Sequence, residues 1–355
     1  MRRWKLGLVL LVATVAGCGH PFIPASTLHR SRAAQVGPPV TGRPLLGVDL
    51  YAQSDYPLPR ARKYGARNLA YVHDTLGAQA VGIAWNFYSP GNHSNQVERN
   101  KITLSPEAVT ALTREAYTNH MVVEYRPLIR VGPKWGWEGF IYPTDPQAWF
   151  NALYQAELPY LQIAQRLKVR EFVVSTELQT LSSSYLWRQF LARVAHVYHG
   201  IVSYAAAEYD YYNSATHPVL PIRLLGMDSY PHINLPPTAT VRQLVAGWSH
   251  RFSGVSKSEL ARTAIDEIGI QAARDAYHAP EAWNTNEGPL DEQVQARWFT
   301  AACRFVARSH MRGIYFWNVN LAGNPARPPY PSPSTFEGKK GALAIHGCLH
   351  ILAQE

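Results

Sequence analysis

Eight apolar, β-prone runs alternate with amphipathic stretches along this 355-residue chain, and this alternation constrains its fold more than any other feature. The runs cover residues 45–51, 80–87, 121–128, 171–177, 200–207, 222–230, 263–268 and 313–317. Helical patterns occupy intervals between them, including 106–119, 146–167, 184–199 and 291–309. Strands that alternate with helices pair in parallel, because each crossover returns the chain to the same edge. Eight such units predict a single (β/α)₈ barrel in the α/β class.

A doubly wound open sheet is the competing architecture, because it also alternates strands with helices. It normally has a glycine-rich phosphate-binding turn after the first strand. Here the first run ends in Asp49-Leu50-Tyr51-Ala52-Gln53, which contains no such turn. The barrel is therefore the predicted fold, and residues 45–355 are predicted to form one domain.

The first 44 residues have the pattern of a targeting segment followed by a tether. Residues 2–5 carry three positive charges and residues 6–16 are apolar, as in an export signal that is too short to span a bilayer. Val15-Ala16-Gly17-Cys18 resembles the lipobox of bacterial lipoproteins, whose cysteine is lipidated after cleavage. We predict a signal peptide over 1–17, lipidation at Cys18 and a flexible linker over 18–44. The protein would then be extracytoplasmic and anchored to the cell membrane, with plain secretion as the alternative.

Export also permits a disulfide, and two cysteines remain if Cys18 carries lipid. Cys303 lies in a helical pattern and Cys348 lies near the C-terminus, so a bridge would tie the tail to the last helix before it. Two buried free thiols are the alternative, because the sequence does not give the distance that a bridge requires.

Charge and motif content exclude several other classes of function. The formal net charge is +9, but the Lys and Arg residues are dispersed and no nucleic-acid-binding motif accompanies them. The 14 His residues lack zinc-site spacing, and the chain has neither a Walker loop nor a Gly-x-Ser-x-Gly elbow. We expect no metal, no other cofactor, no nucleic-acid partner and a monomeric protein.

Two of the eight runs end on a glutamate. Glu177 closes the fourth run and Glu267 lies at the end of the seventh. The active sites of parallel barrels lie at the C-terminal ends of the strands, where two facing carboxylates can cleave a glycosidic bond. Either glutamate alone would favour a solvated or ion-paired carboxylate, whereas the matched pair favours catalysis.

Five segments carry a more specific pattern: Ser175-Thr176-Glu177-Leu178, Val202-Ser203-Tyr204-Ala205-Ala206, Leu225-Gly226-Met227-Asp228-Ser229-Tyr230-Pro231, Asp266-Glu267-Ile268-Gly269 and Gly313-Ile314-Tyr315-Phe316-Trp317-Asn318. In this order and spacing they resemble the clan A retaining glycoside hydrolases on (β/α)₈ barrels, closest to the β-mannanases of glycoside hydrolase family 113. The resemblance covers roughly residues 45–352. It implies that Glu177 is the general acid/base and that Glu267 is the nucleophile.

The resemblance also implies residues that would contact the sugar. Tyr230 would hydrogen-bond the nucleophile, and Trp317, next to Asn318, would be the surface on which a sugar ring stacks. The alternative for both aromatic residues is ordinary packing at the barrel rim or in the core.

The ends of the second and third runs provide further candidates. Trp85, Asn86 and Arg126 could line the pocket or serve structure alone. Trp135 and Trp137, in the loop after the third run, could form an outer sugar subsite or a small core that anchors the loop.

The function predicted from these patterns is cleavage of a β-linked hexosyl polysaccharide or oligosaccharide with retention of configuration, with mannan-type chains first. Two alternatives remain open. One is a surface lipoprotein that binds glycan without cleaving it, and the other is a transglycosylase that remodels an envelope glycan with the same residues.

Overall fold

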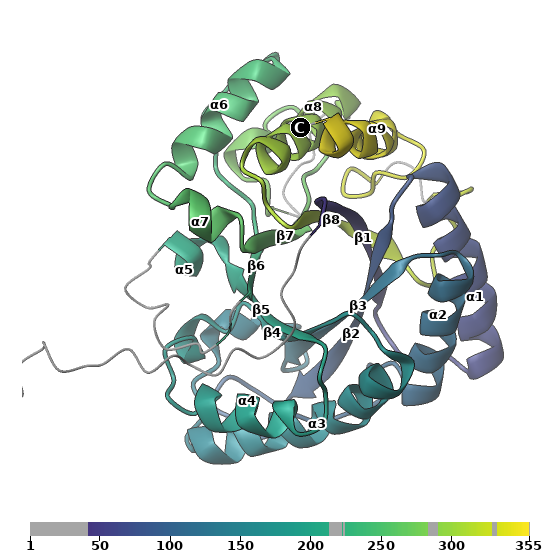
Figure 1. Cartoon of the computed structure of the whole chain (residues 1–355), viewed down its shortest axis with the longest axis vertical. Helices are drawn as coiled ribbons and strands as arrows, with labels where there is room; N and C mark the ends of the chain where they lie inside the picture. Colours follow the sequence, from purple (N-terminus) through teal and green to yellow (C-terminus); the bar gives the residue numbers. More distant parts are fainter. Residues whose placement is uncertain (1–41, 213–221, 223, 283–289, 329–331, 355) are drawn as a thin grey trace, which may run out of the picture. The chain divides into compact units, whose positions relative to one another are not determined.

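Eight parallel strands close into a barrel in sequence order, which confirms the predicted (β/α)₈ fold. The computed structural model describes residues 42–212, 222, 224–282, 290–328 and 332–354. The predicted signal peptide, Cys18 and nearly all of the predicted linker lie outside these residues. Figure 1 looks into the ring of strands, with the helices arranged around its outside.

The strands are β1 (Leu45–Ala52), β2 (Ala80–Ser89), β3 (Val122–Val131), β4 (Glu171–Thr176), β5 (Ile201–Ala207), β6 (Leu224–Asp228), β7 (Thr263–Ile268) and β8 (Gly313–Asn320). The bounds of β7 agree with the sequence pattern, and β4 ends one residue earlier, so that Glu177 is the first residue after it. Strands β2, β3 and β8 run two or three residues further than predicted. Those extra residues lie at the C-terminal ends and include polar side chains such as Ser89, Arg130 and Asn320, which interrupt the apolar pattern.

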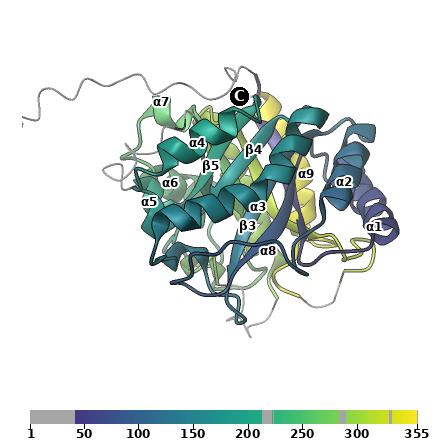
Figure 2. The same ribbon diagram turned by 90° about the horizontal axis from the view of Figure 1, so that it is seen from below.

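The helices are α1 (Leu58–Ala70), α2 (Pro106–Thr118), α3 (Pro146–Leu167), α4 (Trp187–Ala195), α5 (Glu208–Tyr212), α6 (Val241–Arg251), α7 (Lys257–Leu260), α8 (Glu292–Arg308) and α9 (Lys340–Gln354). Helix α3 shows how local chemistry sets a boundary. The Asp145 side chain accepts a hydrogen bond from the Ala148 amide at 3.0 Å, and Pro146 occupies the first turn. The helix ends where Lys168 adopts a left-handed conformation. Figure 2 shows the barrel from the side, with α3 and α4 in front of the strands.

The apolar core lies between the strands and the surrounding helices. It contains large, fully buried aromatic side chains such as Trp149, Trp187 and Trp298. Burial of a side chain of that size removes 150–250 Å² from water, which makes these aromatic residues major contributors to stability. Helices α8 and α9 are also joined covalently, because Cys303 and Cys348 form a disulfide with their Cα atoms 5.5 Å apart.

The interior of the barrel is polar by contrast. Buried charged side chains project from the strands, namely those of Asp49, Glu124, Arg126, Glu171 and Asp266. Glycines on the strands make room for them, since a Cβ at Gly226 would collide with the Asp266 carboxylate. These buried charges can therefore interact with side chains at the C-terminal end of the barrel.

Four pairs of neighbouring strands shift register toward their C-terminal ends. Between β6 and β7, Met227 pairs with Ile265 but Asp228 pairs with Glu267, so β7 contains one extra residue. Similar shifts occur between β4 and β5, between β7 and β8, and between β8 and β1. Irregularities of this kind re-aim side chains and are common next to active sites. They occur just before Glu177, at Glu267 and around Trp317.

Candidate active site

A cleft of about 630 Å³ opens at the C-terminal ends of the strands. It is lined by residues from β1, β3, β4, β6, β7, β8 and the loops that follow, including Tyr51, Arg130, Trp137, Glu138, Glu177, Asp228, Glu267, Trp317, Asn318, Asn320 and Glu337. Both glutamates singled out in the sequence therefore lie in the same cleft. This is the end of the barrel where parallel (β/α)₈ proteins place their functional residues.

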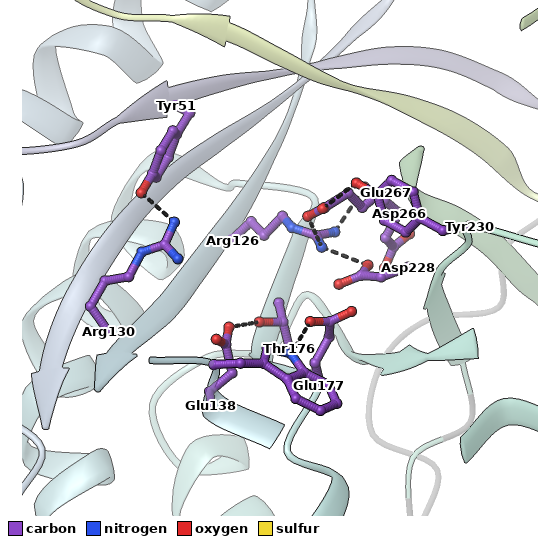
Figure 3. Close-up of polar contacts among 11 residues, drawn as sticks. Tyr51, Arg126, Arg130, Glu138, Thr176, Glu177, Asp228, Tyr230, Asp266 and Glu267 are labelled. Atoms are coloured by element: carbon purple, nitrogen blue, oxygen red, sulfur yellow. Dashed lines mark hydrogen bonds and ion pairs between the residues drawn. The ribbon is translucent and has the colours of Figure 1, made fainter. Parts of the chain in front are cut away.

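The carboxylate of Glu267 is held through both of its oxygens. Tyr230 donates its hydroxyl hydrogen bond to Oε1 at 2.5 Å, and Arg126 donates from Nη2 to Oε2 at 3.0 Å. The same guanidinium binds Asp228 Oδ1 at 2.6 Å and the backbone carbonyl of Asp266 at 2.8 Å. Arg126 has no exposed surface, so it fixes two carboxylates from beneath the cleft (Figure 3).

Glu177 comes from the opposite side of the cleft and has a different environment. In Figure 3 its side chain extends toward Asp228 and Glu267. Its backbone has φ of 49°, a left-handed conformation that is unfavourable for a residue with a side chain. The indole Nε1 of Trp137 donates a hydrogen bond to Glu177 Oε2 at 2.5 Å. Within the described residues, no ion pair joins Glu177 to a cation, whereas Glu267 pairs with Arg126.

The two environments separate the acidities of the glutamates. Burial raises the pKa of Glu267 to about 7; the Asp228 charge adds to this rise, while Arg126 and Tyr230 oppose it. Burial also raises the pKa of Glu177 well above its ordinary value, and the carboxylates of Asp228, Glu138 and Glu267 raise it further. Near neutral pH, Glu177 therefore retains a proton more readily than Glu267 does.

A second polar group borders the cleft on the β1 and β3 side. Asn86 accepts hydrogen bonds from Tyr51 at 3.0 Å and from Arg130 Nε at 3.1 Å. Arg130 Nη2 in turn donates to the Tyr51 hydroxyl at 2.7 Å. The Tyr51 ring lies against Trp317, with ring centroids 4.9 Å apart, so this group fixes the aromatic surface of the cleft.

The predicted sugar-binding residues fall into three groups: residues at the cleft, a residue in the core outside the barrel, and buried residues that support the cleft. Trp317 and Asn318 line the cleft, and Tyr230 holds Glu267 as the resemblance implied. The cleft prediction is wrong for Trp85, which is fully buried and stacks on Tyr160 at 4.7 Å in the core outside the barrel. Its place on β2 aims its side chain at the helices, because neighbouring strand residues face opposite sides.

Asn86 and Arg126 also differ from the prediction that they line the pocket. Both are fully buried, and each acts through a residue that does reach the cleft. Asn86 positions Tyr51 and Arg130, and Arg126 positions Glu267. Functional residues were expected at strand ends, and this rule placed both residues near the cleft. It did not distinguish a residue that lines the cleft from one that holds a lining residue in position.

Several cleft residues were not selected from the sequence, above all Tyr51, Arg130 and Glu138. Tyr51 and Arg130 lie near the ends of their strands, so the same strand-end rule would have found them. Glu138 lies in the loop between β3 and α3, where its carboxylate accepts a hydrogen bond from the Thr176 hydroxyl at 3.1 Å. No sequence pattern marks a loop residue that folds back onto a different strand.

No group of His, Cys, Asp and Glu side chains among the described residues could hold a metal ion. The described part of the chain also has no helix with the length and apolar character needed to cross a membrane.

Comparison with known protein families shows which family the chain belongs to. The sequence model of Glycoside Hydrolase Family 113 matches residues 60–326, which is more than half of the chain. The chain belongs to glycoside hydrolase family 113. This family 113 protein is accordingly a glycoside hydrolase, and its match spans the two glutamates of the cleft. No curated protein sequence matches it.

Solved structures show the same architecture as the family 113 protein. A structure described as a complex of a family 113 β-1,4-mannanase has a TM-score of 0.74 at 16% identity, and the match covers 88% of this chain and 100% of that one. The family 113 β-mannanase from Alicyclobacillus acidocaldarius has a TM-score of 0.68 at 17% identity, covering 88% and 98%. A family 5 mannosidase from Rhizomucor miehei has a TM-score of 0.51 at 14% identity, covering 88% and 94%.

Proposed function

We propose that this glycoside hydrolase cleaves β-linked hexosyl polysaccharide, mannan-type chains first, by a retaining mechanism in which Glu267 is the nucleophile and Glu177 is the acid/base. One observation carries the proposal. The two carboxylates line the same cleft in opposite environments, one held by Arg126 and Tyr230 and the other surrounded by carboxylates. A retaining glycosidase needs one ionised and one protonated carboxylate at the start of its cycle.

The chemistry follows from these environments. The ionised Glu267 attacks the anomeric carbon while Glu177 transfers its proton to the leaving oxygen, and a covalent glycosyl-enzyme forms. Glu177, now a carboxylate, then removes a proton from the water that attacks this intermediate. Arg126 and Tyr230 keep the Glu267 oxygens in place, so that attack requires little reorganisation.

The choice of substrate rests on the relatives and on the aromatic surface. Two of the related structures are described as β-1,4-mannanases. In this chain the rings of Trp317 and Tyr51 border the cleft, as expected of a stacking surface for a sugar. Beside it, the loop after β3 exposes a further set of aromatic side chains, namely Trp135, Trp137, Phe140 and Tyr142. Such a surface favours a polymer that extends beyond the cleavage point.

The substrate is tested with a panel of β-mannan, glucomannan, β-glucan and xylan, with the products identified by mass spectrometry. We expect β-mannan and glucomannan to be cleaved fastest. With mannotetraose as the substrate, products longer than the tetraose would indicate transglycosylation. Cleavage of xylan alone would contradict the hexosyl specificity.

The roles of the two glutamates are tested with one variant of each. Glu267→Gln should abolish turnover but preserve glycan affinity, since the amide retains the shape without the nucleophile. Glu177→Ala should still cleave substrates with good leaving groups, and azide should rescue it and give a β-glycosyl azide, because two inversions restore the configuration. An α-azide would mean that the roles are exchanged, and wild-type turnover in both variants would place the chemistry elsewhere.

We further propose that the protein is exported and anchored by a lipid on Cys18, on the basis of Val15-Ala16-Gly17-Cys18 and the preceding charged and apolar segments. Cys18→Ser should move the protein from the membrane fraction to the soluble fraction. Unchanged fractionation would exclude lipidation at this residue as the anchor.

A further inference from the structure

The contact between Trp137 and Glu177 joins a loop residue to the proposed acid/base. Trp137 lies in the loop between β3 and α3 and its side chain lines the cleft. Its indole N–H donates to Oε2 of Glu177 and not to Oε1. An indole nitrogen is a donor only, so this contact has one possible polarity.

The polarity of the contact decides where the proton of Glu177 lies. The carbonyl oxygen of a neutral carboxylic acid is a far better acceptor than its hydroxyl oxygen. An N–H that donates to Oε2 therefore favours the form in which Oε1 carries the proton. After the proton has moved to the leaving oxygen, the same N–H donates to a carboxylate anion, and this charge-assisted hydrogen bond is stronger.

The Trp137 ring is itself held in place. It lies against Gly139, where a Cβ would collide with three of its ring carbons, and it makes an edge contact with Phe140 at 4.9 Å. The next residue, Glu138, is buried and accepts a hydrogen bond from Thr176, the residue before Glu177. Two consecutive loop residues thus form hydrogen bonds with two consecutive residues at the end of β4.

We propose that Trp137 is a positioning residue for the acid/base: it directs the transferable proton to Oε1 of Glu177 and stabilises the carboxylate that forms when that proton leaves. The inference rests on the proposed roles of the two glutamates. In the step concerned, the Glu267 oxygen forms a bond to the anomeric carbon, the bond from that carbon to the leaving oxygen breaks, and the proton moves from Oε1 to that oxygen.

The charged groups around Glu177 make such a donor useful. Asp228, Glu138 and Glu267 all face its carboxyl group, and together with burial they raise its pKa. The hydroxyls of Tyr204 and Tyr230 also lie within electrostatic range. The hydrogen bond from Trp137 lowers the pKa of Glu177, so it opposes the rise that burial and these carboxylates cause.

The decisive variant is Trp137→Phe, which retains an aromatic ring but removes the N–H. Two substrates separate its effects: mannotetraose, whose leaving group needs a proton, and a dinitrophenyl β-mannobioside, whose leaving group does not. We expect kcat/KM for mannotetraose to fall roughly 10- to 100-fold, the range for loss of a hydrogen bond to a charged group. The kcat/KM for the dinitrophenyl substrate should change little.

Two further variants serve as comparisons. Tyr185→Phe alters an exposed aromatic residue that does not line the cleft, and it should leave both substrates unaffected. Gly139→Ala keeps the indole N–H but displaces the ring, so it should reproduce the selective loss seen with Trp137→Phe.

A measurement that does not depend on activity completes the test. The carboxyl carbon of Glu177 is titrated by ¹³C NMR in wild type and in Trp137→Phe, and assigned by comparison with Glu177→Gln. We expect the pKa of Glu177 to be higher in the Trp137 variant, because the anion has lost a donor. An unchanged pKa, or an equal loss of kcat/KM on both substrates, would overturn the proposal. A wild type inactive on every β-glycoside would refute the proposed function, whereas the titration would still decide whether Trp137 acts on Glu177.

Discussion

At the scale of single residues, the charges around Glu267 should set the pH dependence of activity. A nucleophile must be ionised, so kcat/KM should rise with pH through the pKa of Glu267, which burial and Asp228 raise to about 7. Asp228→Asn removes a neighbouring negative charge and should move this rise to lower pH by about one unit. Tyr230→Phe removes a donor to the Glu267 anion and should move it to higher pH by about as much.

The opposite signs of these two shifts make the measurement specific. Full pH profiles of kcat/KM for wild type and both variants are compared on the same substrate. A shift in the same direction for both variants would mean that the rise reports a group other than Glu267.

At the scale of elements, the disulfide between α8 and α9 should stabilise the helices outside the barrel without affecting catalytic activity. The bridge closes a loop of 45 residues, which corresponds to about 4 kcal/mol of stability in the chain-entropy account. Replacing Cys303 and Cys348 together by Ala should lower the free energy of unfolding by up to this amount. Activity should be retained, because both cysteines lie on helices outside the barrel and neither lines the cleft.

Denaturant unfolding of the double variant measures this effect, with activity assayed on the same preparation. A free energy of unfolding equal to that of wild type would mean that the two thiols are free in the working protein.

At the scale of the whole molecule, buried carboxyl groups should make stability fall as pH rises. Glu157 of α3 is fully buried, and neither of its oxygens has a hydrogen-bond partner among the residues that the structure describes. Burial raises its pKa well above the ordinary value. From the ordinary glutamate pKa upward, the folded state therefore holds a proton that the unfolded state releases. This difference lowers stability by about 1.4 kcal/mol per pH unit for each such group.

Glu157→Gln tests this relation away from the cleft. The variant should lose stability less steeply than wild type between pH 5 and pH 8, because the amide does not titrate. Glu98→Gln, at an exposed glutamate, is the matched control and should leave the slope unchanged. Equal slopes for all three proteins, from thermal unfolding across this range, would contradict a protonated Glu157.

The sequence by itself determined the fold and the position of the two glutamates along the strands. Eight apolar, β-prone runs separated by amphipathic helices allow few topologies other than the barrel, and a barrel brings its strand ends together. Glu177 and Glu267 could be selected because each interrupts an apolar strand at its end. Trp85 was misplaced because the face on which a strand residue lies depends on register, which the apolar runs of buried parallel strands do not reveal.

Only the tertiary structure decided how those glutamates are held. The register shift on β7 sets Glu267 beside Asp228, and such a shift leaves no mark in hydrophobic patterning. Arg126, Tyr230 and Trp137 come from three other segments, and they reach the two glutamates through contacts that span 37 to 141 positions of the sequence. Propensity and periodicity describe neighbours along the chain, whereas acidity depends on neighbours in space, and those exist only once the barrel has closed.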